Sequence, residues 1–75
     1  MPIIPALTAI QVVRALKKIG FVKDRQKGGH LVLIQPTMKA RTVIPIHAGR
    51  TIKKSLLRAI INDAKLSVEE FLKLI

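Results

Sequence analysis

The chain contains no cysteine, no tryptophan and no tyrosine, and phenylalanine occurs only twice among its 75 residues. The lack of cysteine excludes disulfide bonds and thiolate metal sites, and it fits a cytoplasmic location. There is no run of ~18 apolar residues, so we expect no membrane-spanning helix, and residues 1–5 lack the features of a signal peptide. Because base stacking usually needs exposed aromatic rings, any RNA should be recognised mainly through its backbone and shape.

Acidic residues are also scarce, since four Asp and Glu face fourteen Lys and Arg, which gives a net charge of +10. Residues 25–62 contain eight basic residues and no acid. A surplus this large predicts a polyanionic partner, most often nucleic acid. The alternative is a cationic surface that only keeps the protein soluble. A membrane surface is disfavoured, because neither main predicted helix has the bulky aromatic face of an interfacial helix.

Apolar residues make up 49% of the sequence, which predicts a folded chain rather than a disordered one. At this length, residues 1–75 are expected to form one domain. Such a domain buries only roughly 60–65% of its unfolded surface, so its core is thin. Two prolines near the start prevent regular pairing and predict an extended arm over residues 2–7.

A first helix is predicted over residues 9–19. Thr8 and Gln11 match a capping box, in which each side chain bonds the backbone N–H of the other residue. Gly20 suits the position just after the helix, because glycine readily adopts left-handed backbone angles. The apolar residues repeat at helical spacing and predict the buried face: Ala9, Val12, Val13, Leu16 and Ile19.

Three strands are predicted next, over residues 21–26, 30–35 and 41–46. Gly28 and Gly29 permit the positive φ that a tight hairpin between the first two strands needs. The second strand is apolar on both faces, which predicts a central position in the sheet. Alternation places its side chains on two faces: His30, Val32 and Ile34 on one, and Leu31 and Leu33 on the other.

Two helices are predicted to complete the fold, over residues 52–63 and 68–74. Thr51 is the expected cap of the first, and Ser67 with Glu70 forms a capping box for the second. The order α-β-β-β-α-α implies an α+β fold, with a three-stranded antiparallel sheet and its helices on one face. The first of these helices has a predicted buried stripe: Leu56, Leu57, Ile60, Ile61 and Ala64.

Several kinds of catalytic site are excluded by what the chain lacks. Two histidines without a nearby carboxylate or thiolate are too few ligands for zinc, so we predict neither a metal nor a cofactor. Gly28 and Gly29 are not followed by the lysine and serine or threonine of a nucleotide-binding phosphate loop. No serine or cysteine triad can be assembled, because cysteine is missing and acids are few.

Histidine chemistry on a cationic surface remains, and His30 beside the glycine turn is the candidate general base. RNA supplies its own nucleophile, the 2′-hydroxyl, so an enzyme need only remove that proton, stabilise the phosphorane and protonate the leaving 5′-oxygen. Imidazole titrates near neutral pH and can perform either proton transfer. The alternative is that His30 is an ordinary hairpin residue.

Phosphate contacts are expected on both sides of this turn. Arg25 and Lys27 can stabilise charge on phosphoryl oxygens, and the backbone N–H groups of Gly28 and Gly29 are open to a close phosphate. The alternative for the two basic side chains is ordinary solvated charge.

The second half of the chain offers further candidates. His47 follows the third predicted strand and is either a second acid or base or a simple loop residue. A stripe of cations around the predicted helix 52–63 indicates a binding face, because no acid offsets it before Asp63. Its members are Arg50, Lys53, Lys54 and Arg58.

Six short motifs follow one another at family-like spacings: GFV at 20–22, RQKGGH at 25–30, PIHAG at 45–49, KK at 53–54, LR at 57–58 and LSVEEF at 66–71. In this order they resemble the HicA (YcfA-like) toxins of toxin–antitoxin modules, over nearly the whole chain. Members often carry a serine where Gly29 stands here. A glycine commonly ends their second helix where this chain has Lys65, and the loop 37–40 lacks their usual Asp-Gly turn.

The resemblance implies a small fold of the double-stranded-RNA-binding-domain kind, with a C-terminal extension. It implies a metal-independent mRNA interferase whose essential histidine corresponds to His30, and a HicB antitoxin that covers this site. We therefore expect a cytoplasmic toxin ribonuclease in which His30 takes the 2′-hydroxyl proton while Lys27, Lys54 and Arg58 hold phosphates. The alternatives are a non-catalytic RNA-binding module of the same fold and a subunit that binds only an acidic protein.

Overall fold

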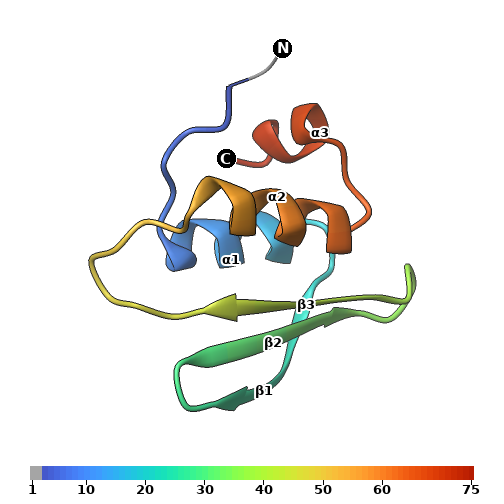
Figure 1. Ribbon diagram of the computed structural model, residues 1–75. Helices are drawn as coiled ribbons and strands as arrows, with labels where there is room; N and C mark the ends of the chain where they lie inside the picture. The colour runs from blue at the N-terminus through green and yellow to red at the C-terminus, as the bar shows by residue number, and fades with distance from the viewer. Residues whose placement is uncertain (1–2) are drawn as a thin grey trace.

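The computed structural model describes residues 3–75, and Pro2 of the predicted arm lies outside this range. Six elements follow in the order α-β-β-β-α-α (Figure 1), which confirms the predicted α+β fold. They are α1 (Ala9–Lys17), β1 (Val22–Lys27), β2 (His30–Gln35), β3 (Ala40–Pro45), α2 (Lys54–Asp63) and α3 (Val68–Leu72).

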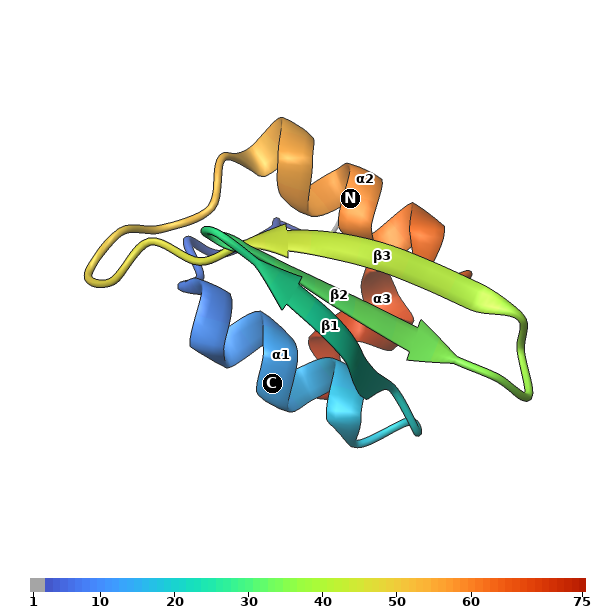
Figure 2. The ribbon, with the colours of Figure 1, turned by 90° about the horizontal axis from the view of Figure 1, so that it is seen from below.

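The three strands form one antiparallel sheet in the order β1-β2-β3, and α1 and α2 lie on one of its faces. Within residues 3–75 no helix covers the other face, which Figure 2 shows from below. The central place of β2 is confirmed, because it is the strand with a partner on each side. Strand β1 is an edge strand, and all six of its residues are exposed.

Helix α1 begins as predicted and ends two residues early. Thr8 Oγ1 accepts a hydrogen bond from the Gln11 backbone N–H, and the Gln11 side chain accepts one from Thr8 N over 2.8 Å. The helix stops at Lys17, and Gly20 has the positive φ of 94° expected after a helix. Gln35 Nε2 donates to Ile19 O over 2.7 Å, and this amide would overlap a Cβ at position 20. Gly20 is therefore required both for its backbone angle and for lack of space.

The core lies between the sheet and the helices. Leu31 and Leu33 of β2, which the alternation predicted to share one face, belong to it together with Ile44 of β3. Thr42 is also buried there, and its hydroxyl donates to Asp63 Oδ2 over 3.3 Å, which satisfies its polar group. The largest fully buried side chains include Phe21, Phe71, Leu16, Leu33, Ile44, Leu57 and Ile60.

Helix α2 begins two residues later than predicted, and Thr51 does not cap it. Its N-cap is Lys53, which makes no side-chain cap hydrogen bond. Thr51 instead forms an isolated antiparallel bridge with Thr8, and Ile52 N donates to Leu7 O over 2.8 Å. Pairing with the start of α1 requires extended backbone at residues 51–52, so the helix cannot begin there.

Leu56 is the one residue of the predicted α2 stripe that is not buried, with 37% of its surface exposed. Leu57, Ile60, Ile61 and Ala64 are all buried, as expected. These four already follow the i, i+3, i+4, i+7 spacing that fills one helix face. Leu56 precedes that stripe by one position, about 100° around the helix, and so faces away from the core.

The C-terminal segment folds back onto the domain, as predicted. Ser67 and Glu70 form the expected capping box, although α3 ends at Leu72 rather than at residue 74. Phe71 is fully buried, and the half-buried Leu74 packs against the core. Hydrogen bonds from the Ser67 backbone N–H and then its side chain lower the pKa of Glu70.

Candidate functional site

The β1–β2 turn presents His30 to solvent at one end of the sheet. His30 is the first residue of β2, pairs with Lys27 of β1 and Pro45 of β3, and is exposed. Gly28 has a φ of 58°, and a Cβ there would meet nothing within 4 Å. A positive φ at the first turn residue suits a two-residue hairpin and favours glycine. The turn is therefore open enough for a phosphate to approach its backbone.

A backbone hydrogen bond ties this turn to the segment that carries the second histidine. Ile46 N donates to Gly29 O over 2.6 Å, which continues the β2–β3 pairing beyond Pro45. His47 follows directly and is exposed. The structure therefore brings His30 and His47 to the same end of the sheet.

The register of the strands shows which side chains share the open face with His30. Residues directly opposite each other in an antiparallel pair project from the same face. Three rows result: Lys27, His30 and Pro45; then Arg25, Val32 and Val43; then Val22, Ile34 and Arg41. The predicted candidates Arg25 and Lys27 thus belong to the same face as His30, and Lys27 is its direct neighbour.

The acid nearest in sequence to this turn, Asp24, is paired with arginines. Its Oδ2 lies 3.6 Å from Arg41 Nη1 and 3.9 Å from Arg25 Nε. Both ion pairs are exposed, so each contributes only about 0–1 kcal/mol. Asp24 therefore partly neutralises Arg25, whereas the row of His30 contains Lys27 and no acid.

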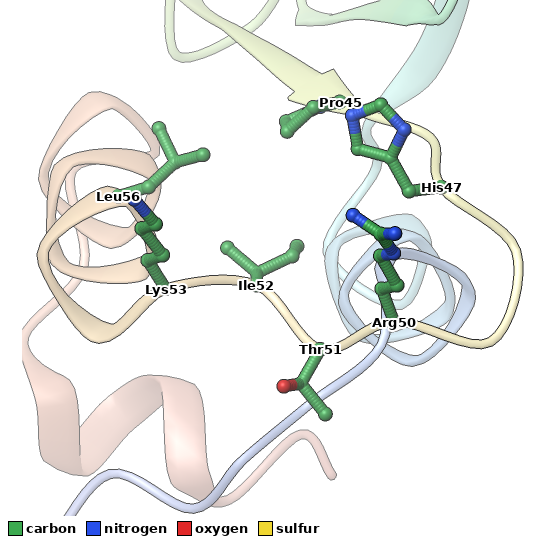
Figure 3. A pocket seen from close by; sticks show the side chains of 7 residues that line it. All are labelled: Pro45, His47, Arg50, Thr51, Ile52, Lys53 and Leu56. Atoms are coloured by element: carbon green, nitrogen blue, oxygen red, sulfur yellow. The ribbon is translucent and has the colours of Figure 1, made fainter.

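A groove opens between the end of β3 and the start of α2, with a volume of ≈ 380 Å³. Figure 3 shows its side chains: Pro45, His47, Arg50, Thr51, Ile52, Lys53 and Leu56. We call Pro45, Ile52 and Leu56 the apolar floor, and His47, Arg50 and Lys53 the basic rim. His47 also borders a smaller hollow of ≈ 150 Å³ against the start of α1.

The four predicted cations of the second half separate into two pairs. Arg50 and Lys53 precede α2 and line the groove, so the expected helical stripe from Arg50 to Arg58 does not exist. Lys54 and Arg58 do lie four residues apart on α2, where both are exposed. The first turn of α2 contains no acid, which leaves its partial positive charge uncompensated.

The sequence patterns do not predict the apolar floor. Helical spacing predicts a core position for Leu56, and the predicted elements place Pro45 in a strand and Ile52 in a helix. One signal was present in the sequence, because Leu56 exceeds what the four-residue stripe of α2 needs to fill its buried face. An extra leucine beside two lysines at 53–54 indicates an exposed apolar position.

Within residues 3–75, no group of three or more His, Asp and Glu side chains is placed to hold a metal ion. Over the same residues, no helix has both the length and the apolar character needed to cross a bilayer.

The strand order and the one-sided helical layer define a small basic α+β protein with an open sheet face, on which the row of His30 is exposed. The family model for the HicA toxin of bacterial toxin-antitoxin systems matches residues 10–66. The chain therefore belongs to the HicA toxin family, which confirms the resemblance, and its family implies an antitoxin partner. A search of curated proteins finds no match.

Proposed function

We propose that this HicA-family toxin is an endoribonuclease that cuts mRNA in the cytoplasm, with His30 as general base. The observation that carries the proposal is the exposed imidazole of His30 at an open glycine turn, directly opposite Lys27. The reaction needs no metal-activated water, because the substrate's own 2′-hydroxyl is the nucleophile.

In the proposed reaction, His30 accepts the proton of the 2′-hydroxyl as its oxygen attacks the adjacent phosphorus. The O2′–P bond forms, the P–O5′ bond breaks, and the leaving 5′-oxygen takes up a proton. The products are a 2′,3′-cyclic phosphate and a 5′-hydroxyl. General base catalysis of this kind contributes roughly 10²–10⁴-fold, which suits a slow regulatory enzyme.

Cations near the turn are proposed to stabilise the phosphorane. Lys27 is the nearest basic residue by register, and the backbone N–H groups around Gly28 and Gly29 face open space that a phosphate oxygen can enter. Arg25, held loosely by Asp24, adds charge to the same face. Lys54 and Arg58 on α2 are proposed to bind phosphates further along the RNA.

His47 is the proposed proton donor to the leaving 5′-oxygen. It follows Ile46, whose backbone N–H is bonded to Gly29, and so belongs to the same end of the sheet as His30. A second imidazole is chemically suited to this step, since it can give up a proton near neutral pH. A His47→Ala variant should lower the cleavage rate less than His30→Ala if water can replace this donor.

The antitoxin is proposed to be a HicB-type protein that covers the His30 end of the sheet. The open face of the sheet presents half-buried or exposed apolar side chains: Val43 in the row next to that of His30, and Val22 and Ile34 in the row beyond it. Such a surface suits a protein partner, and covering His30 would block access of RNA.

The test is cleavage of a defined RNA by the purified protein in EDTA, with both new ends identified. Cyclic phosphate and 5′-hydroxyl ends are expected, and a 2′-deoxy residue at the cut site should stop the reaction. Ends with a 3′-hydroxyl would contradict attack by the 2′-oxygen. Salt-dependent RNA binding with no cleavage would instead identify a non-catalytic RNA-binding module.

A further inference from the structure

We propose that the groove between β3 and α2 binds one nucleotide of single-stranded RNA, with its base on the apolar floor and its phosphate at the basic rim. The inference rests on the proposed function, because it names a substrate subsite beside the proposed catalytic histidine. It assigns a role to Leu56 and Ile52, which the cleavage mechanism does not use.

The floor is an exposed apolar surface on a very basic protein. Leu56 is 37% exposed, and Pro45 is half-buried, whereas Ile52 is only 8% exposed at the bottom of the groove. In Figure 3, Ile52 and Leu56 point into the space that Pro45 and His47 border on the opposite side. A flat aromatic base fits such a surface, because both of its apolar faces are removed from water when it enters the groove.

The groove is held open by backbone bonds rather than by mobile side chains. The Thr8–Thr51 bridge and the Ile52 N bond to Leu7 O fix the floor, and Pro45 is held by its pairing with His30. A volume of ≈ 380 Å³ lies within the roughly 300–1,000 Å³ of typical small-ligand sites. A largely preformed site of this size loses little entropy on binding.

Charge selects a nucleotide rather than a neutral ligand. His47, Arg50 and Lys53 stand at the rim, and none of the seven lining residues is acidic. Arg50 and Lys53 can meet a phosphate while the floor meets the attached base. With Arg50 and Lys53 engaged by the phosphate, the lining offers no amide or carboxylate to the base edge, so we expect little discrimination between bases.

The position of the groove connects it with the cleavage site. Pro45 lines the groove and pairs directly with His30 on the neighbouring strand. Neighbouring strands lie roughly 4.8 Å apart, so a nucleotide in the groove is close in the RNA chain to a phosphate at His30. The groove therefore orients the substrate strand relative to the general base.

The first experiment uses the absence of tryptophan, since Leu56→Trp introduces a single indole into the groove. The titrant is a 2′-O-methyl RNA 12-mer, which has no free 2′-hydroxyl and so cannot be cut by the proposed route. Base stacking on the indole should quench its fluorescence and tighten binding about fivefold or more. Inorganic polyphosphate of the same charge should cause neither change.

The matched control is Asn62→Trp, which places an exposed indole on the same helix, roughly 9 Å further along its axis and outside the groove. The proposal is overturned if both variants respond equally to RNA, or if polyphosphate quenches Leu56→Trp as strongly as RNA does. It is also overturned if only an acidic protein partner, and not RNA, alters the indole.

A second pair of variants tests the rim and does not depend on the indole. Arg50→Gln should lower the slope of log K against log salt by about 0.7 for single-stranded RNA, whereas Arg14→Gln on α1 should leave the slope unchanged. Equal slopes for the two would contradict a phosphate at Arg50. Binding is measured here without cleavage, so the two proposals can fail separately. A protein that shows the indole and salt responses but cuts no RNA overturns the proposed nuclease activity alone. A protein that cuts RNA but lacks these responses overturns the proposed groove subsite alone.

Discussion

The two ends of the sheet are built differently. At the end near the β2–β3 loop, side chains hold the backbone: Gln35 bonds Ile19 O and Thr37 N, and Lys65 Nζ donates to Met38 O. At the other end, within residues 3–75, His30 and His47 take part in no side-chain hydrogen bond. Polar side chains bond the backbone at the first end, whereas the two imidazoles at the second end make no such bond.

The same contrast holds for residues with positive φ. At the His30 end this backbone is supplied by Gly28 and Gly49, which have no side chain to obstruct an approaching strand. At the far end it is supplied by Gly20, which packs against Gln35, and by two residues with side chains, Lys39 with a φ of 53° and Lys65 with a φ of 60°. Within residues 3–75, residues other than glycine therefore adopt positive φ at the far end and not at the His30 end.

The largest effect should come from removing the imidazole at the open end. His30→Ala is expected to lower the RNA cleavage rate about 10²–10⁴-fold. The free energy of unfolding should stay within about 0.5 kcal/mol, because His30 is exposed. Gel-based cleavage rates and urea unfolding measure the two quantities, and an unchanged rate would remove His30 as the base.

The second-largest effect is expected at the β2–β3 loop end of the sheet. A substitution there should lower the stability of the protein and leave the cleavage rate unchanged. Gln35→Ala removes a buried amide and leaves Ile19 O and Thr37 N without their partner, at a cost of about 1–3 kcal/mol in unfolding free energy. The exposed Gln26 of β1 is a matched control, and Gln26→Ala should be nearly neutral. A loss of cleavage by folded Gln35→Ala protein would show that the two ends are coupled.

A smaller effect should come from relieving strain. Lys39→Gly is expected to stabilise the protein by about 1 kcal/mol, because a side chain at positive φ is unfavourable. Lys65→Gly should gain less, since it also loses the bond to Met38 O. Lys73 has an ordinary φ of −71°, so Lys73→Gly should destabilise by about 0.5–1 kcal/mol. Thermal unfolding measures the stability of the three variants. A change of the same sign in all three would argue against backbone strain at Lys39 and Lys65.

The smallest effect should be a pH dependence at the C-terminal segment. The pKa of Glu70 is lowered by the Ser67 backbone N–H, so the ionised carboxylate favours the folded state. This contribution is complete above the carboxyl's ordinary pKa and is lost as pH falls through the lowered folded value. Tm should therefore fall more steeply below about pH 4.5 in the parent than in Glu70→Gln. Glu69→Gln, with a similar charge change, should leave that slope unaltered.

Features that depend on residues close together in the sequence agree with the structure. The capping boxes at Thr8 and Ser67 depend on residues three apart, and β2 is fixed by alternation within six residues. The predicted capping role of Thr51 is wrong, because Thr51 pairs with Thr8, more than forty positions away in the sequence. No pattern near Thr51 announces that pairing, which moves the start of α2.

The candidate site was predictable to the same extent. The exposed turn with His30 and Lys27 depends on adjacent residues, and it lies where the glycines indicated. The groove does not depend on adjacent residues, because it is formed by the end of β3, a connecting segment and the first turn of α2. Only the folded chain shows that Pro45, Ile52 and Leu56 share one surface.

The bond from Ile46 N to Gly29 O has a mechanical consequence. It joins the backbone just before His30 to the backbone just before His47. We call this connection between the two histidines the clamp. Motion of the hairpin tip is therefore expected to be shared by the backbone at both histidines. Cutting this clamp, as a proline at position 46 would, should leave each ring present but free to drift independently.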